Sequence, residues 1–248
     1  MSSFKIGLAS VTFRNKSIEE IVALCRSAGV GFIEWGADVH VVTAEDAKKA
    51  KALCDEAGIK ISSYGSYYRV GYSKQEEWLT LCENARIMGA ESIRIWLGKK
   101  NSEDTDGKEY KILLDDLENI CAIAEKYGLL VCPECHDYTF NNDTQAFLKI
   151  QADVGKSNFK TYFQSRYFRM TYDLDRIEKT YDYIENVHVS YSDMKREQEE
   201  NKIKDENYLD TLLKRFREKN FDGVVILEFT ENSDENAFSE DIRKLKAY

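Results

Sequence analysis

The feature that most constrains the fold of this chain is a unit that recurs along its whole length. Each unit has a short apolar run rich in β-branched residues, then a polar loop and an amphipathic helical pattern. We predict eight strands, at residues 4–10, 31–36, 60–65, 92–98, 129–134, 159–164, 186–191 and 224–229. Strands that alternate with helices in this way form a parallel sheet covered by those helices.

Glycines end four of the predicted helices. They are Gly29, Gly58, Gly89 and Gly128. Each follows a helical pattern and precedes the next predicted strand by a few residues. Because glycine adopts a positive φ without steric penalty, it is favoured as the left-handed cap at such positions. The glycines therefore support the predicted helix boundaries.

The predicted fold is a (β/α)8 TIM barrel that forms a single domain over residues 1–248. Eight strands at intervals of about thirty residues suit this fold, whose usual length is close to that of this chain. A doubly wound open sheet is the alternative. Neither of the glycine-rich phosphate-binding motifs of such sheets follows the first predicted strand, and nothing marks the two edge strands that an open sheet would have.

Composition narrows the functional classes. The formal net charge of -9 argues against binding to duplex DNA, which normally requires a basic surface. No apolar run is long enough to cross a bilayer, and the first residues lack the pattern of a signal peptide. We therefore expect a cytoplasmic protein without nucleic-acid or membrane partners. The sequence is compatible with a homo-oligomer.

The six cysteines do not suggest a disulfide framework or a thiolate metal site. Four of them fall in helical patterns, where they resemble small buried hydrophobic residues. Cys132 and Cys135 form a C-x-x-C motif, but no second pair completes a four-cysteine site. Strand alternation also places Cys132 and Glu134 on one face and Cys135 on the other.

Polar side chains that can bind a metal stand at or near the ends of four consecutive predicted strands. They are Glu134, Gln164, His188 and Glu228. Because the carboxyl ends of barrel strands share one rim, we expect these side chains to converge. Two carboxylates, an amide oxygen and an imidazole suit Mn²⁺, Mg²⁺, Co²⁺ or Zn²⁺ better than a thiolate-binding metal. The alternative is that each residue only accepts hydrogen bonds from loop amides or packs as a polar residue.

Other residues near the same rim suit a pocket for a sugar or polyol. These candidates are Glu34, Trp35, His40, Tyr64, Arg69, Arg94, Trp96, His136 and Arg166. Aromatic faces stack on the apolar side of sugars, and guanidinium groups bind hydroxyls or anions. For Trp35 and Trp96 the alternative is packing between the barrel and its helices, and for Arg166 it is a surface salt bridge. The charge-dense stretch at 194–207 is predicted as a solvated loop.

The chain resembles the xylose isomerase-like barrels described as sugar phosphate isomerases/epimerases, a superfamily that includes endonuclease IV, tagatose-type epimerases and inosose dehydratases. The matching segments are FIEWGADVHV, SSYGSYYRVG, SIRIWLG, PECHDYTFNNDT, YFQ, NVHV and ILEFTEN. Their order and spacing cover essentially the whole chain. The resemblance implies a TIM barrel with a divalent metal ion at its mouth.

The resemblance also implies a ligand set of Glu, Asp, His and Glu. These fall on Glu134, position 164, His188 and Glu228 of this chain. Position 164 is a glutamine here, so one anionic ligand is replaced by a neutral one. Weaker metal binding or a different metal preference is expected to follow.

If the resemblance extends to activity, the reaction is proton transfer next to a sugar carbonyl. Glu134 and Glu228 would then alternate as base and acid on an enediolate that the metal stabilises. His136, two residues after Glu134, is expected to contact a substrate hydroxyl.

Three functional classes follow from these observations. The first is a metal-dependent sugar isomerase or epimerase. The second is a nuclease acting on abasic DNA. This class is less suitable, because the chain has only three histidines to bind metal ions and its net charge of -9 disfavours DNA. The third is a dehydratase of the inosose type or a barrel that binds a sugar without turning it over, and fold alone does not choose among these.

Overall fold

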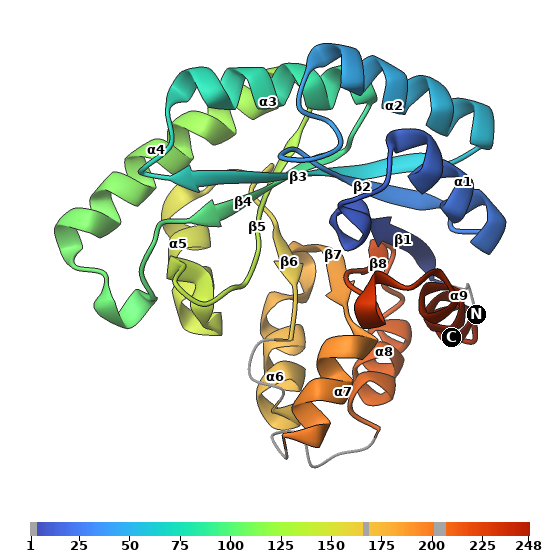
Figure 1. Ribbon diagram of the computed structural model, residues 1–248. Coiled ribbons are helices and arrows are strands. Elements are labelled where there is room, and N and C mark those ends of the chain that lie inside the picture. The colour runs from blue at the N-terminus through green and yellow to red at the C-terminus, as the bar shows by residue number, and fades with distance from the viewer. Residues whose placement is uncertain (1–3, 166–168, 201–206) are drawn as a thin grey trace.

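All eight predicted strands are present and form a parallel barrel (Figure 1). The computed structural model describes residues 4–165, 169–200 and 207–248. The strands are β1 (Lys5–Ala9), β2 (Phe32–Gly36), β3 (Lys60–Val70), β4 (Ser92–Leu97), β5 (Leu130–Pro133), β6 (Thr161–Phe163), β7 (Ile184–Val189) and β8 (Val224–Leu227). They are ordered β5-β4-β3-β2-β1-β8-β7-β6, so the predicted TIM barrel is confirmed.

The barrel closes between β5 and β6 through a short contact rather than a full ladder. The Val131 N–H donates to the Asn158 carbonyl at 2.8 Å, and the Lys160 N–H donates to the Val131 carbonyl at 3.0 Å. One step further along β5, Pro133 has no N–H to donate toward β6. The Thr161 hydroxyl donates to the Pro133 carbonyl instead, at 3.0 Å.

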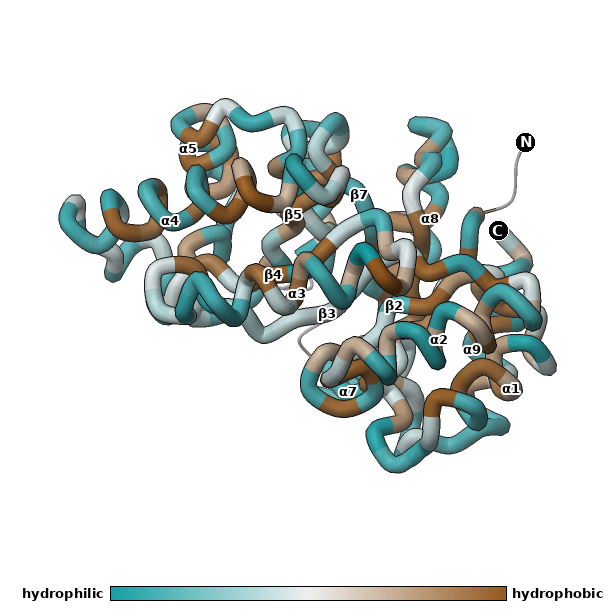
Figure 2. Tube along the Cα trace, turned by 90° about the horizontal axis from the view of Figure 1, so that it is seen from above, coloured by the Kyte–Doolittle hydropathy of each residue, from teal (hydrophilic) through white to brown (hydrophobic). Residues whose placement is uncertain are grey.

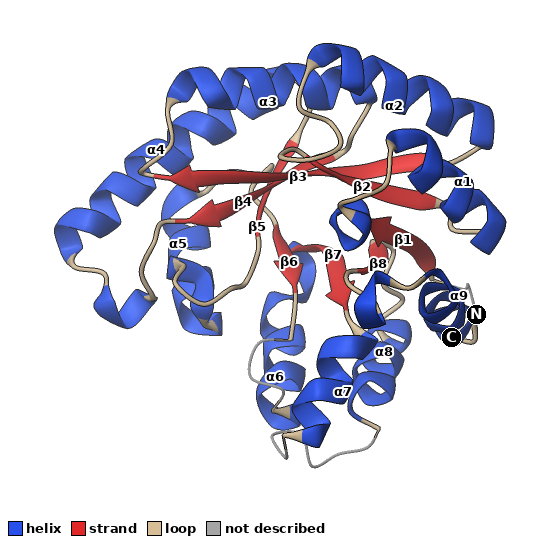
Figure 3. Cartoon of the chain, viewed as in Figure 1, coloured by secondary structure: helices blue, strands red, loops and turns tan. Residues whose placement is uncertain are grey.

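Helices surround the strands on the outside (Figure 3). They are α1 (Ile18–Ala28), α2 (Ala44–Ala57), α3 (Gln75–Met88), α4 (Gly107–Lys126), α5 (Thr144–Val154), α6 (Met170–Thr180), α7 (Tyr191–Glu199), α8 (Tyr208–Glu218) and α9 (Glu235–Lys246). All four predicted glycine positions have positive φ, between 62° and 73°. Figure 2 shows hydrophilic and hydrophobic turns alternating along the helices, as expected where one helix face packs on the barrel.

The predicted loop at 194–207 is wrong over its first part. Residues 194–199 belong to α7, which begins directly after β7 with Ser190 as its N-cap. The Ser190 hydroxyl accepts a hydrogen bond from the Asp193 N–H at 3.1 Å, which satisfies one of the free donors of the first turn. Residues 201–206 lie outside the described part of the chain.

The core has two layers. The larger one fills the space between the strands and the helices, and a smaller cluster fills the inside of the barrel. Cys132 and Tyr162 belong to the inner cluster, whereas the Cys135 thiol contacts Arg176 of α6. The opposite orientations of the two cysteines agree with the predicted strand alternation. Among the described residues, no helix is both long and apolar enough to cross a membrane.

Candidate active site

Charged side chains from five strands meet at the carboxyl end of the barrel. They are Glu34 of β2, Arg94 of β4, Glu134 after β5, His188 of β7 and Glu228 after β8, here called the central cluster. Each residue is between 2% and 6% exposed. Alternate residues of a strand face the barrel interior, and these five occupy such inward positions.

Arg94 lies at the middle of the central cluster. Its Nη1 atom is 3.0 Å from Glu134 Oε2, 3.4 Å from Glu228 Oε1 and 3.6 Å from Glu34 Oε1. Burial would lower the pKa of the guanidinium group, but the three carboxylates raise it above its ordinary value. Arg94 is therefore a permanent cation. With three carboxylates and one guanidinium, these four residues carry two formal negative charges.

The two ring nitrogens of His188 face different carboxylates. Nδ1 lies 3.2 Å from Glu228 Oε2 and 3.8 Å from Glu134 Oε1, and Nε2 lies 3.4 Å from Glu34 Oε1. Burial would lower the pKa of His188, but Glu228 and Glu34 raise it well above its usual range. Nδ1 thus points to the two predicted catalytic residues, and Nε2 points to β2.

Glu34 is fixed by two hydroxyl groups. Its Oε2 atom accepts hydrogen bonds from Ser63 Oγ and Tyr162 Oη, both at 2.7 Å. Burial would raise the pKa of Glu34, but the charges of His188 and Arg94 lower it far below its usual value. Glu34 is consequently an ionised carboxylate with a defined orientation.

The residues predicted as metal ligands fit a divalent cation. Glu134, His188 and Glu228 each offer one ligand atom, and these atoms all lie within 4.8 Å of one another. Gln164 Oε1 is buried and makes no hydrogen bond of ordinary geometry within the described part of the protein. Glu134 Oε2 and the two ring nitrogens of His188 also make none, although Glu134 Oε2 lies 3.0 Å from Arg94 Nη1 and the His188 nitrogens lie 3.2–3.8 Å from carboxylate oxygens. Buried polar atoms without such bonds are costly unless something else satisfies them. A hard cation would satisfy the Gln164 oxygen, and it would add positive charge beside three carboxylates.

Three of the predicted pocket residues form a group at the rim. The guanidinium carbon of Arg69 lies 4.4 Å from the centre of the Trp96 ring, and the His136 ring lies 4.5 Å from it. Tyr67, which is 44% exposed, stacks on Trp96 at 6.2 Å. Arg69 also donates to the Gly98 carbonyl at 2.9 Å. These residues form an aromatic wall beside the central cluster.

Three other predicted pocket residues do not reach the central cluster. Trp35 and Tyr64 are at most 1% exposed and lie in the outer core layer, where the Tyr64 hydroxyl donates to the Val41 carbonyl. The expectation that they bind substrate is not supported, because Glu34 takes the inward position on β2 and turns Trp35 toward the helices. His40 Nδ1 pairs with Ser10 Oγ at 2.9 Å, and its ring packs on Trp35. Arg166 lies outside the described residues.

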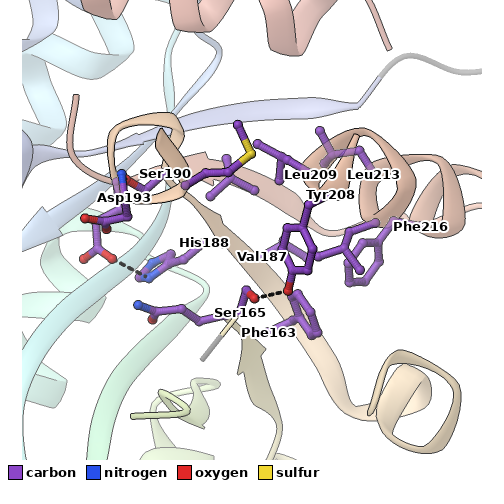
Figure 4. Close-up of a pocket in the computed structure, with 15 residues that line it drawn as sticks. Phe163, Ser165, Val187, His188, Ser190, Asp193, Tyr208, Leu209, Leu213 and Phe216 are labelled. Carbon is purple, nitrogen blue, oxygen red and sulfur yellow. Dashed lines mark hydrogen bonds and ion pairs between the residues drawn. The ribbon is translucent and has the colours of Figure 1, made fainter. Parts of the chain in front are cut away.

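Two cavities lie near the central cluster. A cavity of about 670 Å³ opens at the mouth and is lined by His136, Gln164 and Phe229 together with Asp193 of α7. A second pocket is apolar and holds only about 40 Å³. Figure 4 shows this pocket beside His188, enclosed by side chains of β6, β7 and α8. Of these two cavities among the described residues, the mouth cavity is the one with room for a sugar.

Two site residues were not identified from the sequence, and the central position of Arg94 was not foreseen. Tyr162 and Ser63 were read only as parts of strands, yet both hold Glu34. Strand alternation could have indicated Tyr162, since it shares the inward face of β6 with Gln164. No local signal could have paired Tyr162 with Glu34, which is 128 residues away in the chain.

Comparison with known protein families gives one match over most of the chain. The model of the xylose isomerase-like TIM barrel family matches residues 22–248. The comparison with curated proteins gives no match.

Several solved structures have the same fold. One is a probable 3-DHS dehydratase from Bacillus anthracis, with a TM-score of 0.78 and 18% identity over 97% of this chain and 98% of that one. Another is a 3-keto-D-glucoside 4-epimerase from E. coli, with a TM-score of 0.75 and 15% identity over 99% and 100%. A third is D-psicose 3-epimerase from Clostridium cellulolyticum H10, solved with D-tagatose, with a TM-score of 0.72 and 13% identity over 98% and 96%. At these identities the likeness extends to the fold alone.

Proposed function

The chain belongs to the xylose isomerase-like TIM barrel family, and from that premise we propose that it is a metal-dependent sugar isomerase or epimerase. The observation that carries the proposal is the buried group of Glu134, His188 and Glu228, whose ligand atoms lie within 4.8 Å of one another. Gln164 and His136, from the same end of the barrel, line an open cavity. The proposed substrate is a small sugar or polyol derivative with a carbonyl group.

The proposed metal ligands are Glu134, Gln164, His188 and Glu228, and the candidate ions are Mn²⁺, Mg²⁺, Co²⁺ and Zn²⁺. A bound divalent ion would act as a Lewis acid that lowers the energy of negative charge on the substrate oxygens. The support for this set is that the ligand atoms of Glu134, His188 and Glu228 converge and that the buried Gln164 Oε1 makes no ordinary hydrogen bond among the described residues.

Glu134 and Glu228 are proposed to move the proton. One carboxylate removes the proton from the carbon next to the carbonyl. The other must begin the turnover in its protonated form, and it returns that proton to the enediolate, so the two groups exchange protonation states in each turnover. Arg94 Nη1 contacts both carboxylates, at 3.0 Å and 3.4 Å, so it holds them in place. Its fixed charge also stabilises negative charge that develops on a substrate bound nearby.

The rim residues are proposed to bind the rest of the substrate. Trp96 and His136 present ring surfaces that suit the apolar face of a sugar. His136 lines the mouth cavity and its Nδ1 pairs with the Asp137 carbonyl at 2.8 Å, which leaves Nε2 as the nitrogen for a hydroxyl. Arg69 would help to fix the Trp96 ring through its cation–π contact.

A solvent-deuterium exchange screen tests this function. The purified protein is incubated with Mn²⁺ and a panel of ketoses in deuterated water, and the recovered sugars are analysed by mass spectrometry and NMR. We expect deuterium in the carbon next to the carbonyl of at least one sugar and a second isomer of that sugar. Loss of water would indicate a dehydratase instead. Absence of Mn²⁺ uptake at millimolar supply would contradict the metal-dependent mechanism.

A charge at position 164 is expected to strengthen metal binding. Gln164→Glu keeps the length of the side chain and adds the missing negative charge, so we expect Mn²⁺ to bind about tenfold more tightly. Gln164→Met, which has similar length but no ligand oxygen, is expected to weaken binding. Isothermal titration calorimetry measures both. Equal affinities in the two variants would show that residue 164 is not a ligand.

A further inference from the structure

We propose that Glu34 is a positioning residue that orients His188 for metal binding, by holding Nε2–H so that Nδ1 faces Glu134 and Glu228. This inference rests on the proposed function, because it takes His188 as a metal ligand. Glu34 itself is not proposed as a ligand. A histidine that binds a metal through one nitrogen commonly donates its other N–H to a carboxylate, which fixes both the tautomer and the orientation of the ring.

The first support is that the two carboxylate oxygens of Glu34 contact different groups. Oε2 accepts from the hydroxyls of Ser63 and Tyr162, both at 2.7 Å. Oε1 is the oxygen that faces His188 Nε2, at 3.4 Å. Because both hydroxyls bind the same oxygen, the carboxylate cannot rotate without losing two hydrogen bonds. Oε1 therefore stays directed at the histidine.

The second support is the packing of the His188 ring. The Tyr162 ring meets it edge to face, with centroids 4.8 Å apart and planes at 88°. The same tyrosine thus holds the Glu34 carboxylate with its hydroxyl and the imidazole with its ring edge. His188 is 4% exposed, so water competes little for its nitrogens. The imidazole is fixed from β6 and β2 at once.

The third support is the space that β3 leaves for the carboxylate. A Cβ atom at Gly65 would lie 3.1 Å from Glu34 Oε1 and 3.4 Å from Arg94 Nη2. A larger residue would push Glu34 away from His188. Arg94 Nη1, at 3.6 Å from the same oxygen, balances the charge of Glu34 inside the barrel.

Glu34→Gln is the sharpest test, because the neighbours dictate how the amide must lie. Ser63 and Tyr162 both donate, so the glutamine oxygen takes the place of Oε2 and the NH₂ group faces His188. In the neutral imidazole, which is the form that binds a metal, the NH₂ group favours the tautomer in which Nε2 accepts and Nδ1 carries the proton. A metal ion would have to displace that proton from the nitrogen that faces Glu134 and Glu228, so metal binding is weakened.

Two measurements, one by NMR and one of Mn²⁺ affinity, test the effect of Glu34→Gln. In metal-free protein with ¹⁵N-labelled histidine, wild type is expected to show a downfield Nε2–H signal for His188 that exchanges slowly with water. With three histidines in the chain, assignment is simple. Glu34→Gln is expected to lose this signal and to bind Mn²⁺ about 10–100-fold more weakly. Glu34→Asp, which keeps the charge but shortens the side chain, is expected to lose less affinity.

A second variant covers the case in which Glu34→Gln does not fold. Tyr162→Phe keeps the ring against His188 and removes one donor to Glu34, so the Nε2–H signal should exchange faster and Mn²⁺ affinity should fall several-fold. An unchanged signal and unchanged affinity in either folded variant overturn the role of Glu34. If wild type binds no Mn²⁺, the proposed function fails. An Nε2–H signal that still depends on Glu34 would then show that Glu34 orients the His188 ring, but for a purpose other than metal binding.

Discussion

Glu228→Ala is expected to abolish metal binding and proton exchange. Glu228 is a proposed ligand and a proposed acid or base, and its carboxylate contacts both Arg94 Nη1 at 3.4 Å and His188 Nδ1 at 3.2 Å. We expect Mn²⁺ affinity to fall by more than the 10–100-fold that the loss of an outer partner of a ligand typically costs. Elemental analysis after dialysis and calorimetric titration measure the change.

Two variants make the result interpretable. Glu228→Gln keeps the shape of the side chain and removes its charge, so its affinity should fall between those of wild type and Glu228→Ala. Glu235→Ala removes an exposed carboxylate that pairs with Lys16 at 2.5 Å, outside the central cluster, and should leave metal binding unchanged. Retention of one Mn²⁺ per chain in Glu228→Ala would exclude Glu228 as a ligand.

The backbone after Glu228 and His136 has a feature that the sequence does not signal. Phe229 and Tyr138 both have φ near 60°, a conformation that non-glycine residues rarely adopt. Phe229 is held there by its N–H, which donates to Thr12 Oγ1 at 3.0 Å. Such conformations cost free energy and cluster at functional sites, so they agree with the placement of the site at this end of the barrel.

The fold was predictable from the sequence because its signals are local. Apolar runs of β-branched residues and capping glycines mark each strand and helix without reference to the rest of the chain. The carboxyl ends of the strands then indicate the rim, and Glu134, His188 and Glu228 meet there as expected. Trp35 and Tyr64 were predicted in the pocket because they lie close to strand ends. Alternation within their strands turns both side chains toward the helices instead.

The organisation of the central cluster was not predictable, because its contacts join distant strands. Arg94 and Glu228 are 134 residues apart in the chain, and their contact depends on the register and closure of the whole barrel. Arginine at a strand end is equally consistent with a substrate contact or an ion pair. Only the arrangement of three carboxylates around its guanidinium distinguishes a permanent internal cation from a surface residue.

Arg94→Met is therefore expected to destabilise the metal-free protein strongly. Methionine has similar length and no charge, so the substitution leaves three buried carboxylates without their shared cation. Removing one partner of a buried charged group typically costs about 3–5 kcal/mol of unfolding free energy. Urea unfolding in the presence of a chelator measures this loss.

A divalent cation should recover much of the stability that Arg94→Met loses relative to wild type. This recovery would distinguish a counter-charge role of Arg94 from a role in packing alone. Binding at about 100 times Kd adds about 2.7 kcal/mol to wild type as well, so the recovery is measured as the extra gain of the variant. That extra gain is expected because the cation would supply the positive charge that Glu34, Glu134 and Glu228 now share with Arg94. Arg69→Met is the matched control, since it loses one cation–π contact and one hydrogen bond at the rim. Its smaller loss should not depend on Mn²⁺. If Arg94→Met is equally destabilised with and without Mn²⁺, the carboxylates do not need Arg94 as their counter-charge.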